Sequence, residues 1–191
     1  MTRNNQFGRT MIEVLAVLAI LGMVSATILQ AIGRTFDKTK VSRICQQIVE
    51  LQKNVNSRYA VDGTYKYMTV DDLVKERIIP TDMIGARGEI YHAYKSAVEI
   101  NTADAGGHNG EDKAFRVVFK KIPRHVCMEL LAINWQANNT TDLISITVGA
   151  KTYYWPDGNA ARVSNDTLPL DMIKAGPLCT GDNMEIEWVF Y

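Results

Sequence analysis

The sequence predicts an α+β fold in which one long N-terminal helix packs on an antiparallel β-sheet. Three observations support this prediction. No proline occurs before Pro80, apolar residues recur at helical spacing before residue 60, and several short segments that alternate apolar and polar residues follow. A helical region followed by a run of strands is typical of α+β domains. Because neither an internal repeat nor a low-complexity linker interrupts the chain, we expect a single domain.

The long helix is expected from about Thr10 to Tyr59. In its second half an apolar stripe has spacings of 3, 4, 3 and 4 residues and consists of Val41, Ile44, Ile48, Leu51 and Val55. Such a stripe predicts a helix with one buried face. Asp62 and Gly63 supply the turn chemistry that ends it. The first half is apolar on all sides, so we expect the second half to pack on the domain and the hydrophobic first half to protrude.

The segments after the helix alternate between turn signals and short regular elements. Thr69, Asp72 and Pro80 predict the N-cap, the capping-box partner and the end of a short helix. A second short helix is expected to have Pro123 at its first position. The predicted strands are 89–95, 97–101, 113–122 and 185–191, while 142–155 is either a β-hairpin or one long strand. A turn is expected at 156–159.

Composition excludes some classes of function. The net charge is zero, with 21 basic and 21 acidic residues, so no specific nucleic-acid partner is expected. The three cysteines form no CxxC pair, which argues against a zinc site or a thioredoxin-like motif. One disulfide with a third cysteine left over is typical of an exported domain. Cys45 lies beside the apolar stripe and is interpreted as a small buried hydrophobe, with a free or intermolecular thiol as the alternative.

Side chains that could serve catalysis or metal binding are scattered along the chain. His125 lies two residues from Cys127, a spacing that does not bring side chains together on a helix, so no Cys–His nucleophile and no enzyme is predicted. His92 and His108 are expected at surface or strand positions. Oxygen ligands for calcium are available at Asp157, Asn159, Asp182 and Asn183. The favoured interpretation of these residues is that they form turns. We therefore expect no catalytic residue, metal or cofactor.

The N-terminal segment carries one unexpected charge, Glu13. The 20 residues from Val14 to Gly33 have no charged side chain and would span about 30 Å as a helix, which is the thickness of one hydrocarbon core. This run is too long for a secretory signal, and no clear small-residue cleavage site follows it. A simple membrane anchor accounts for the length. It does not account for Glu13, because a carboxylate within a membrane costs about 2.5–3.5 kcal/mol, unless the side chain snorkels to the interface.

A cut after Gly8 would give Glu13 a partner. The new α-amino group would belong to Arg9, four residues before Glu13, and this spacing places both groups on one helix face. The run "GRTMIE" from Gly8 to Glu13, followed by an apolar helix, resembles the class III signal of type IV prepilins. Arg9 departs from that family, which usually has Phe, Met or another apolar residue at this position.

This resemblance implies a division of the chain and a role for each part. Residues 1–8 are a leader that a prepilin peptidase removes, after which the new N-terminus at Arg9 is methylated. Residues 9–33 form a transmembrane helix that later becomes the filament core, where Glu13 pairs with the N-terminus of a neighbouring subunit. Residues 34–191 form the globular pilin domain, which includes the C-terminal half of the long helix.

The resemblance also implies a disulfide between Cys127 and Cys179, which would bound the variable D-region of type IV pilins. This bond closes a loop of about 53 residues and contributes about 4 kcal/mol in the chain-entropy model. The loop length and the helix around Cys127 resemble the larger type IVb pilins, whereas the short leader resembles type IVa. The resemblance therefore favours a type IVb-like globular domain.

The predicted function is that of a structural subunit of a type IV pilus used in adhesion, motility or DNA transfer. The expected partners are further copies of this chain, other pilins, the prepilin peptidase and an assembly platform in the inner membrane. The chain is expected in the inner membrane as a single-pass protein before assembly and in the extracellular pilus afterwards. One alternative is a pseudopilin of a type II secretion system. Another is a membrane-anchored extracytoplasmic binding protein that does not polymerise.

Overall fold

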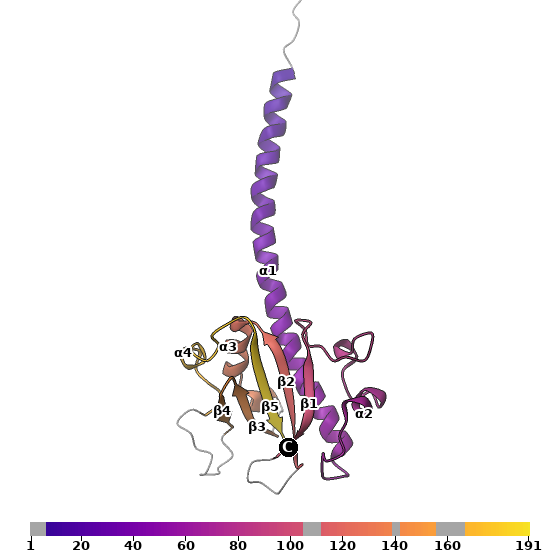
Figure 1. Cartoon of the computed structure of the whole chain (residues 1–191). Coiled ribbons are helices and arrows are strands. Elements are labelled where there is room, and N and C mark those ends of the chain that lie inside the picture. Colours follow the sequence, from indigo (N-terminus) through magenta and orange to yellow (C-terminus); the bar gives the residue numbers. More distant parts are fainter. Residues whose placement is uncertain (1–6, 105–111, 139–141, 156–166) are drawn as a thin grey trace, which may run out of the picture. The chain divides into compact units, whose positions relative to one another are not determined.

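The computed structural model describes residues 7–104, 112–138, 142–155 and 167–191 (Figure 1). The chain divides into two compact units, Met1–Lys40 and Val41–Tyr191. The first helix, α1 (Phe7–Tyr59), contributes its N-terminal part to the first unit and its C-terminal part to the second. Most of the predicted leader and the predicted turn at 156–159 lie outside the described residues.

Helix α1 confirms the predicted long helix. All five residues of the apolar stripe are buried, with at most 7% of their surface exposed, so the stripe is the face that packs into the second unit. The helix ends after Tyr59, whose carbonyl accepts a hydrogen bond of 3.0 Å from the amide of Gly63. Gly63 has a φ of 60°, a left-handed conformation that glycine adopts without steric cost.

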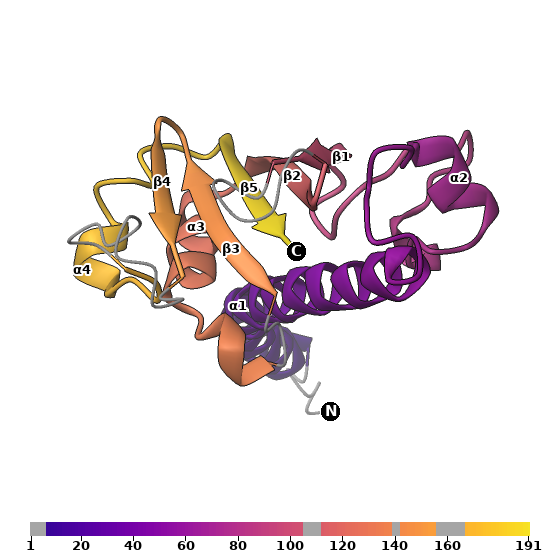
Figure 2. The same ribbon diagram turned by 90° about the horizontal axis from the view of Figure 1, so that it is seen from below.

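The second unit is built around a five-stranded antiparallel sheet with the strand order β1-β2-β5-β3-β4. The strands are β1 (Val98–Ala103), β2 (Ala114–Ile122), β3 (Leu143–Val148), β4 (Lys151–Tyr154) and β5 (Met184–Phe190). The C-terminal part of α1 lies along one face of this sheet (Figure 2). The predicted α+β class is therefore confirmed.

Aromatic side chains fill much of the core between the sheet and α1. Trp188 of the central strand β5 is fully buried and meets Phe119 and Trp135 edge-on, with ring centroids 5.3 and 6.0 Å away. Phe115 and Phe190, from the neighbouring strands β2 and β5, stack at 5.5 Å. Such aromatic pairs contribute about 0.5–1.5 kcal/mol each beyond their buried area. The core is thus concentrated on the strand that lies in the middle of the sheet.

Helix α2 (Val70–Lys75) begins where predicted, with Thr69 as its N-cap, but it ends earlier than predicted. The amide of Ile78 bonds to the carbonyl of Leu73 at 2.9 Å, and Arg77 has a φ of 58°. These two features form a Schellman-type C-cap, which closes the helix without need of the proline that follows. A non-glycine residue therefore occupies the left-handed position of this cap.

The structure also answers two questions that the sequence prediction raised about α3 and about residues 142–155. Helix α3 (Arg124–Ala132) follows Pro123, whose ψ of 150° makes it the N-cap and not the predicted first helical residue. Segment 142–155 forms the β3-β4 hairpin, in which Gly149 has a φ of 61°. Three short elements have no counterpart in the sequence prediction, namely η1 (Thr81–Met83), η2 (Trp135–Asn138) and α4 (Met172–Ala175).

The predicted strand at 89–95 is wrong. The segment forms isolated bridges through Ile90 and Tyr91 and then turns back. In the turn, the amide of Lys95 donates to the carbonyl of His92 at 2.7 Å. Lys95 has a φ of 58°, which is incompatible with extended backbone. The alternation of side chains therefore reflects a turn that buries His92, and the first regular strand begins only at β1.

Candidate functional site

The N-terminal part of α1 presents a continuous apolar surface. From Met11 to Ser25 every side chain is exposed, and the large apolar side chains in this stretch are 47–74% exposed. Monomeric soluble proteins rarely expose contiguous apolar patches of more than a few hundred Å². An exposed apolar surface of this kind is typical of segments that contact lipid or other protein chains.

Glu13 is an acidic side chain on this apolar surface, and it lies together with Val14 and Val17 on one side of the helix. Gly8 and Arg9 precede it within α1, so the backbone is helical from the predicted cleavage site to the carboxylate. Positions 9 and 13 are about one helical turn apart. This spacing places both positions on one helix face, whereas the predicted pairing of Glu13 with the N-terminus of a neighbouring subunit depends on a second chain.

The functional roles predicted for residues 9–33 depend on other molecules. In the part of the chain that the structure describes, no helix is both long and apolar enough to cross a membrane. Cleavage after Gly8, methylation of Arg9 and pairing of Glu13 require an enzyme or a second subunit. These roles stay predictions.

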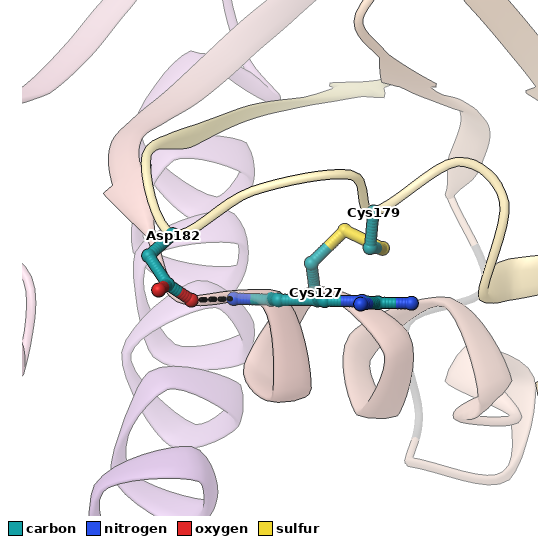
Figure 3. Close-up of a disulfide and its surroundings, with 4 residues drawn as sticks. Cys127, Cys179 and Asp182 are labelled. Atoms are coloured by element: carbon teal, nitrogen blue, oxygen red, sulfur yellow. Dashed lines mark hydrogen bonds between the residues drawn. A yellow bond between two sulfur atoms is a disulfide. The ribbon is translucent and has the colours of Figure 1, made fainter.

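Cys127 and Cys179 are joined in a disulfide, which is the pairing implied by the sequence resemblance (Figure 3). Their Cα atoms are 5.9 Å apart, and both side chains are fully buried. Cys127 lies in the first half of α3, while Cys179 follows α4 and precedes β5. The bond therefore fixes α3 to the segment that leads into the central strand.

Asp182 lies beside this disulfide and accepts a hydrogen bond from the N-terminus of α3. One of its carboxylate oxygens accepts a hydrogen bond of 3.4 Å from the amide of Arg124 (Figure 3). Pro123 has no side chain that could cap α3, so Asp182 supplies an acceptor and a negative charge at the N-terminus of α3.

Of the residues considered as calcium ligands, Asp157 and Asn159 lie outside the described residues. Among the residues that are described, no group of three or more His, Cys, Asp or Glu side chains could hold a metal ion.

A polar cluster that the apolar periodicity did not predict attaches α1 to the segment before β1. Gln47 is only 2% exposed. Its amide nitrogen donates to Asp82 at 2.6 Å, and its amide oxygen accepts from the backbone of Ala93 at 3.1 Å. Asp82 also accepts a hydrogen bond of 2.9 Å from Arg43. A stripe of apolar residues therefore describes only part of the buried face of α1.

A second polar cluster lies farther along the same helix. Asp142 accepts hydrogen bonds from the side-chain amides of Gln52 and Asn56 at 3.0 and 2.8 Å. The hydroxyl of Tyr65 donates to the side-chain oxygen of Asn56 at 2.9 Å. Burial, with a smaller effect from Asp142, raises the pKa of Tyr65 to about 12. The phenol therefore stays protonated and remains a donor at physiological pH.

Cys45 is outside the disulfide. Its side chain is half-buried and packs against the main hydrophobic core. Burial raises the pKa of its thiol to about 11, with a smaller contribution from the charge of Glu129. A thiol with so high a pKa is a poor nucleophile. These properties favour the interpretation of Cys45 as a small buried hydrophobe.

The histidines are placed differently from one another. His125 is exposed, and its neighbour Cys127 has no free thiol because it is part of the disulfide. His108 lies outside the described residues. The expectation for His92 is wrong, because its side chain is neither on the surface nor in a strand. It is 1% exposed and lies in the turn that replaces the predicted strand. Aromatic and polar side chains alternate in part from 89 to 95, so the sequence gave no signal that distinguished this turn from a strand.

The chain matches a protein-family model described as PilS N terminal over residues 38–190. The chain belongs to this family of type IV pilins. The fold of this pilin is similar to that of TcpA, a type IV pilin from Vibrio cholerae El Tor biotype. The TM-score is 0.54, with 14% identity over 80% of this chain and 99% of that chain.

This pilin also resembles a type IVb pilin from Salmonella typhi, with a TM-score of 0.48 and 14% identity over 75% of this chain and 96% of that chain. A comparison with curated protein sequences gives no match. The family match identifies the chain as a type IV pilin-like structural subunit.

Proposed function

We propose that this pilin is a subunit of a type IV pilus. It is made as a membrane-inserted precursor, cut after Gly8 by a prepilin peptidase, methylated at Arg9 and polymerised by an assembly platform in the inner membrane. The finished filament is extracellular and serves adhesion, motility or DNA transfer. The observation that carries this proposal is the exposed apolar surface of α1 from Met11 to Val24, on a chain of the type IV pilin family.

In a filament, the apolar surface of α1 contacts the helices of other subunits instead of lipid. Helix contacts in a filament core are about as apolar as lipid tails, so the apolar side chains alone favour no particular register between subunits. Glu13 supplies that preference. An unpaired carboxylate in an apolar environment costs about 2.5–3.5 kcal/mol, and only a register that brings an α-amine to it removes this cost. A cut after Gly8 creates such an amine at Arg9.

Replacement of Glu13 by Val tests this role in the native cell. We expect Glu13→Val to leave membrane insertion and leader removal intact and to reduce sheared surface fibres to below about one tenth of the wild-type amount. Glu50→Val is the matched control, because Glu50 lies on the same helix and is exposed in the second unit. The control should form fibres. Normal fibres from Glu13→Val would refute the role of Glu13 in setting the register.

Leader removal is measured in a separate experiment. Incubation of the precursor with a prepilin peptidase should release residues 1–8, and mass spectrometry of mature pilin should find one added methyl group on the amine of Arg9. An intact precursor would contradict the cleavage site. Shear fractions also separate the alternatives, since a pseudopilin gives no surface fibres and a monomeric binding protein remains in the membrane fraction.

A further inference from the structure

His92 joins three parts of the second unit at one point. It begins the turn formed by residues 92–96, which we call the 92–96 turn. Its Nε2 lies 2.7 Å from the carbonyl oxygen of Lys120 in β2, and its ring stacks on Phe119 with centroids 5.1 Å apart. The next residue, Ala93, donates its amide to Gln47 of α1 at 3.1 Å. The 92–96 turn is thus attached to both the sheet and the long helix.

The partners of the ring determine its protonation state. A carbonyl oxygen can only accept, so Nε2 of His92 must carry a proton and donate it to Lys120. The amide of Tyr94 can only donate, and it lies 3.1 Å from Nδ1, so Nδ1 must be unprotonated. The imidazole is therefore neutral and held in one tautomer. Burial lowers the pKa of His92, against a smaller opposing effect of the bond to Lys120.

Protonation of Nδ1 would break this arrangement. The added N–H would point at the amide N–H of Tyr94, so one hydrogen bond would be replaced by two opposed donors. The resulting cation would be buried beside Phe119 with no adjacent carboxylate among its described contacts. A buried unpaired charge is strongly unfavourable. The ring would therefore have to leave its position to reach water.

The charged groups on the surrounding elements do not offset this effect. On β2, the ammonium of Lys120 is bonded to Glu99. On the 92–96 turn itself, Lys95 is exposed and carries the same sign as a protonated imidazole. Gln47 of α1 links the 92–96 turn to the carboxylate of Asp82 in η1, and this carboxylate is already bonded to Gln47 and Arg43.

We propose that His92 is a pH-sensitive latch, which holds the 92–96 turn on β2 while its imidazole is neutral and releases the turn when the imidazole is protonated. Because the pKa is lower in the folded state, the stabilisation is complete above the ordinary histidine pKa of 6.5. It is lost as the pH falls from that value through the folded-state pKa. The inference does not depend on whether the chain polymerises.

The test uses the full chain in detergent micelles and compares wild type with His92→Gln between pH 7.5 and pH 4.5. In that range wild type should lose at least about 3 °C more in Tm than the variant. His125→Gln is the matched control, because His125 is exposed, and it should behave as wild type. Equal losses of Tm in wild type and His92→Gln would overturn the proposal.

A second measurement needs no variant and therefore remains decisive if His92→Gln fails to fold. Side-chain ¹⁵N shifts of His92 should report the Nε2–H tautomer at pH 7.5 and a pKa below 6.5. After correction for intrinsic exchange rates, protection of the Ala93 and Tyr94 amides should fall about tenfold on protonation of the ring. A pKa of 6.5 or above, or unchanged protection, would contradict the latch.

Discussion

The disulfide between Cys127 and Cys179 allows a quantitative prediction. The double variant Cys127→Ala/Cys179→Ala removes a link between residues 52 positions apart in the sequence. In the chain-entropy model, opening a loop of this size lowers the free energy of unfolding by about 4 kcal/mol. Domains are typically stable by about 5–15 kcal/mol, so this is a large fraction of the total. At about 2–4 °C per kcal/mol, Tm should fall by about 8–16 °C.

Thermal and urea unfolding of both proteins, without reductant, measure this difference. Alanine is preferred to serine because both cysteine side chains are fully buried and a hydroxyl would lack a partner. Cys45→Ala is the control, since it removes a half-buried thiol that forms no disulfide, and it should cost less than about 1.5 kcal/mol. A double variant within about 1 kcal/mol of wild type would show that loop closure is not what the bond contributes.

Two further predictions concern single residues on or near α1. Because the pKa of the Cys45 thiol is raised to about 11, iodoacetamide at pH 8 should alkylate it about 10²-fold more slowly in the folded chain than in urea, and equal rates would refute its burial. Asp82→Ala should lower the free energy of unfolding by about 1–3 kcal/mol, because it leaves the buried amide of Gln47 without its acceptor. Asp82→Asn retains an acceptor oxygen and should cost less, so identical losses in chemical denaturation would contradict this explanation.

The long periodic pattern of α1 predicted that helix correctly, whereas the sequence did not predict several of the short elements. The stripe from Val41 to Val55 identifies α1 because its burial repeats over four turns. Asp62 and Gly63 mark the end of α1 because Gly63 has the backbone conformation that its position needs. In contrast, α4 has only four residues and is held by the hydrogen bonds and disulfide around it. Helices of that length are not stable by local preference alone.

The predictions for the N-terminal candidate site depend on spacing along the chain, and the roles of its residues stay predictions. Gly8, Arg9 and Glu13 are separated by distances along the chain that a helix converts directly into geometry. The pairing of Cys127 with Cys179 came from resemblance, since their positions alone left other pairings open. The bonds of His92 to a carbonyl 28 residues away could not be predicted, because the register of β2 determines which backbone atoms face the ring.

The position of β5 has a consequence for how the domain is completed. Strands β1 and β2 pair with each other, as do β3 and β4, but in the described sheet β2 and β3 meet only through β5. β5 is the last strand along the chain. During synthesis or export the two hairpins can therefore form early, while the sheet stays divided and the edges of β2 and β3 that β5 later covers are unpaired. An unfinished domain therefore exposes strand edges that the finished domain does not, and the core is closed only when β5 adds Trp188.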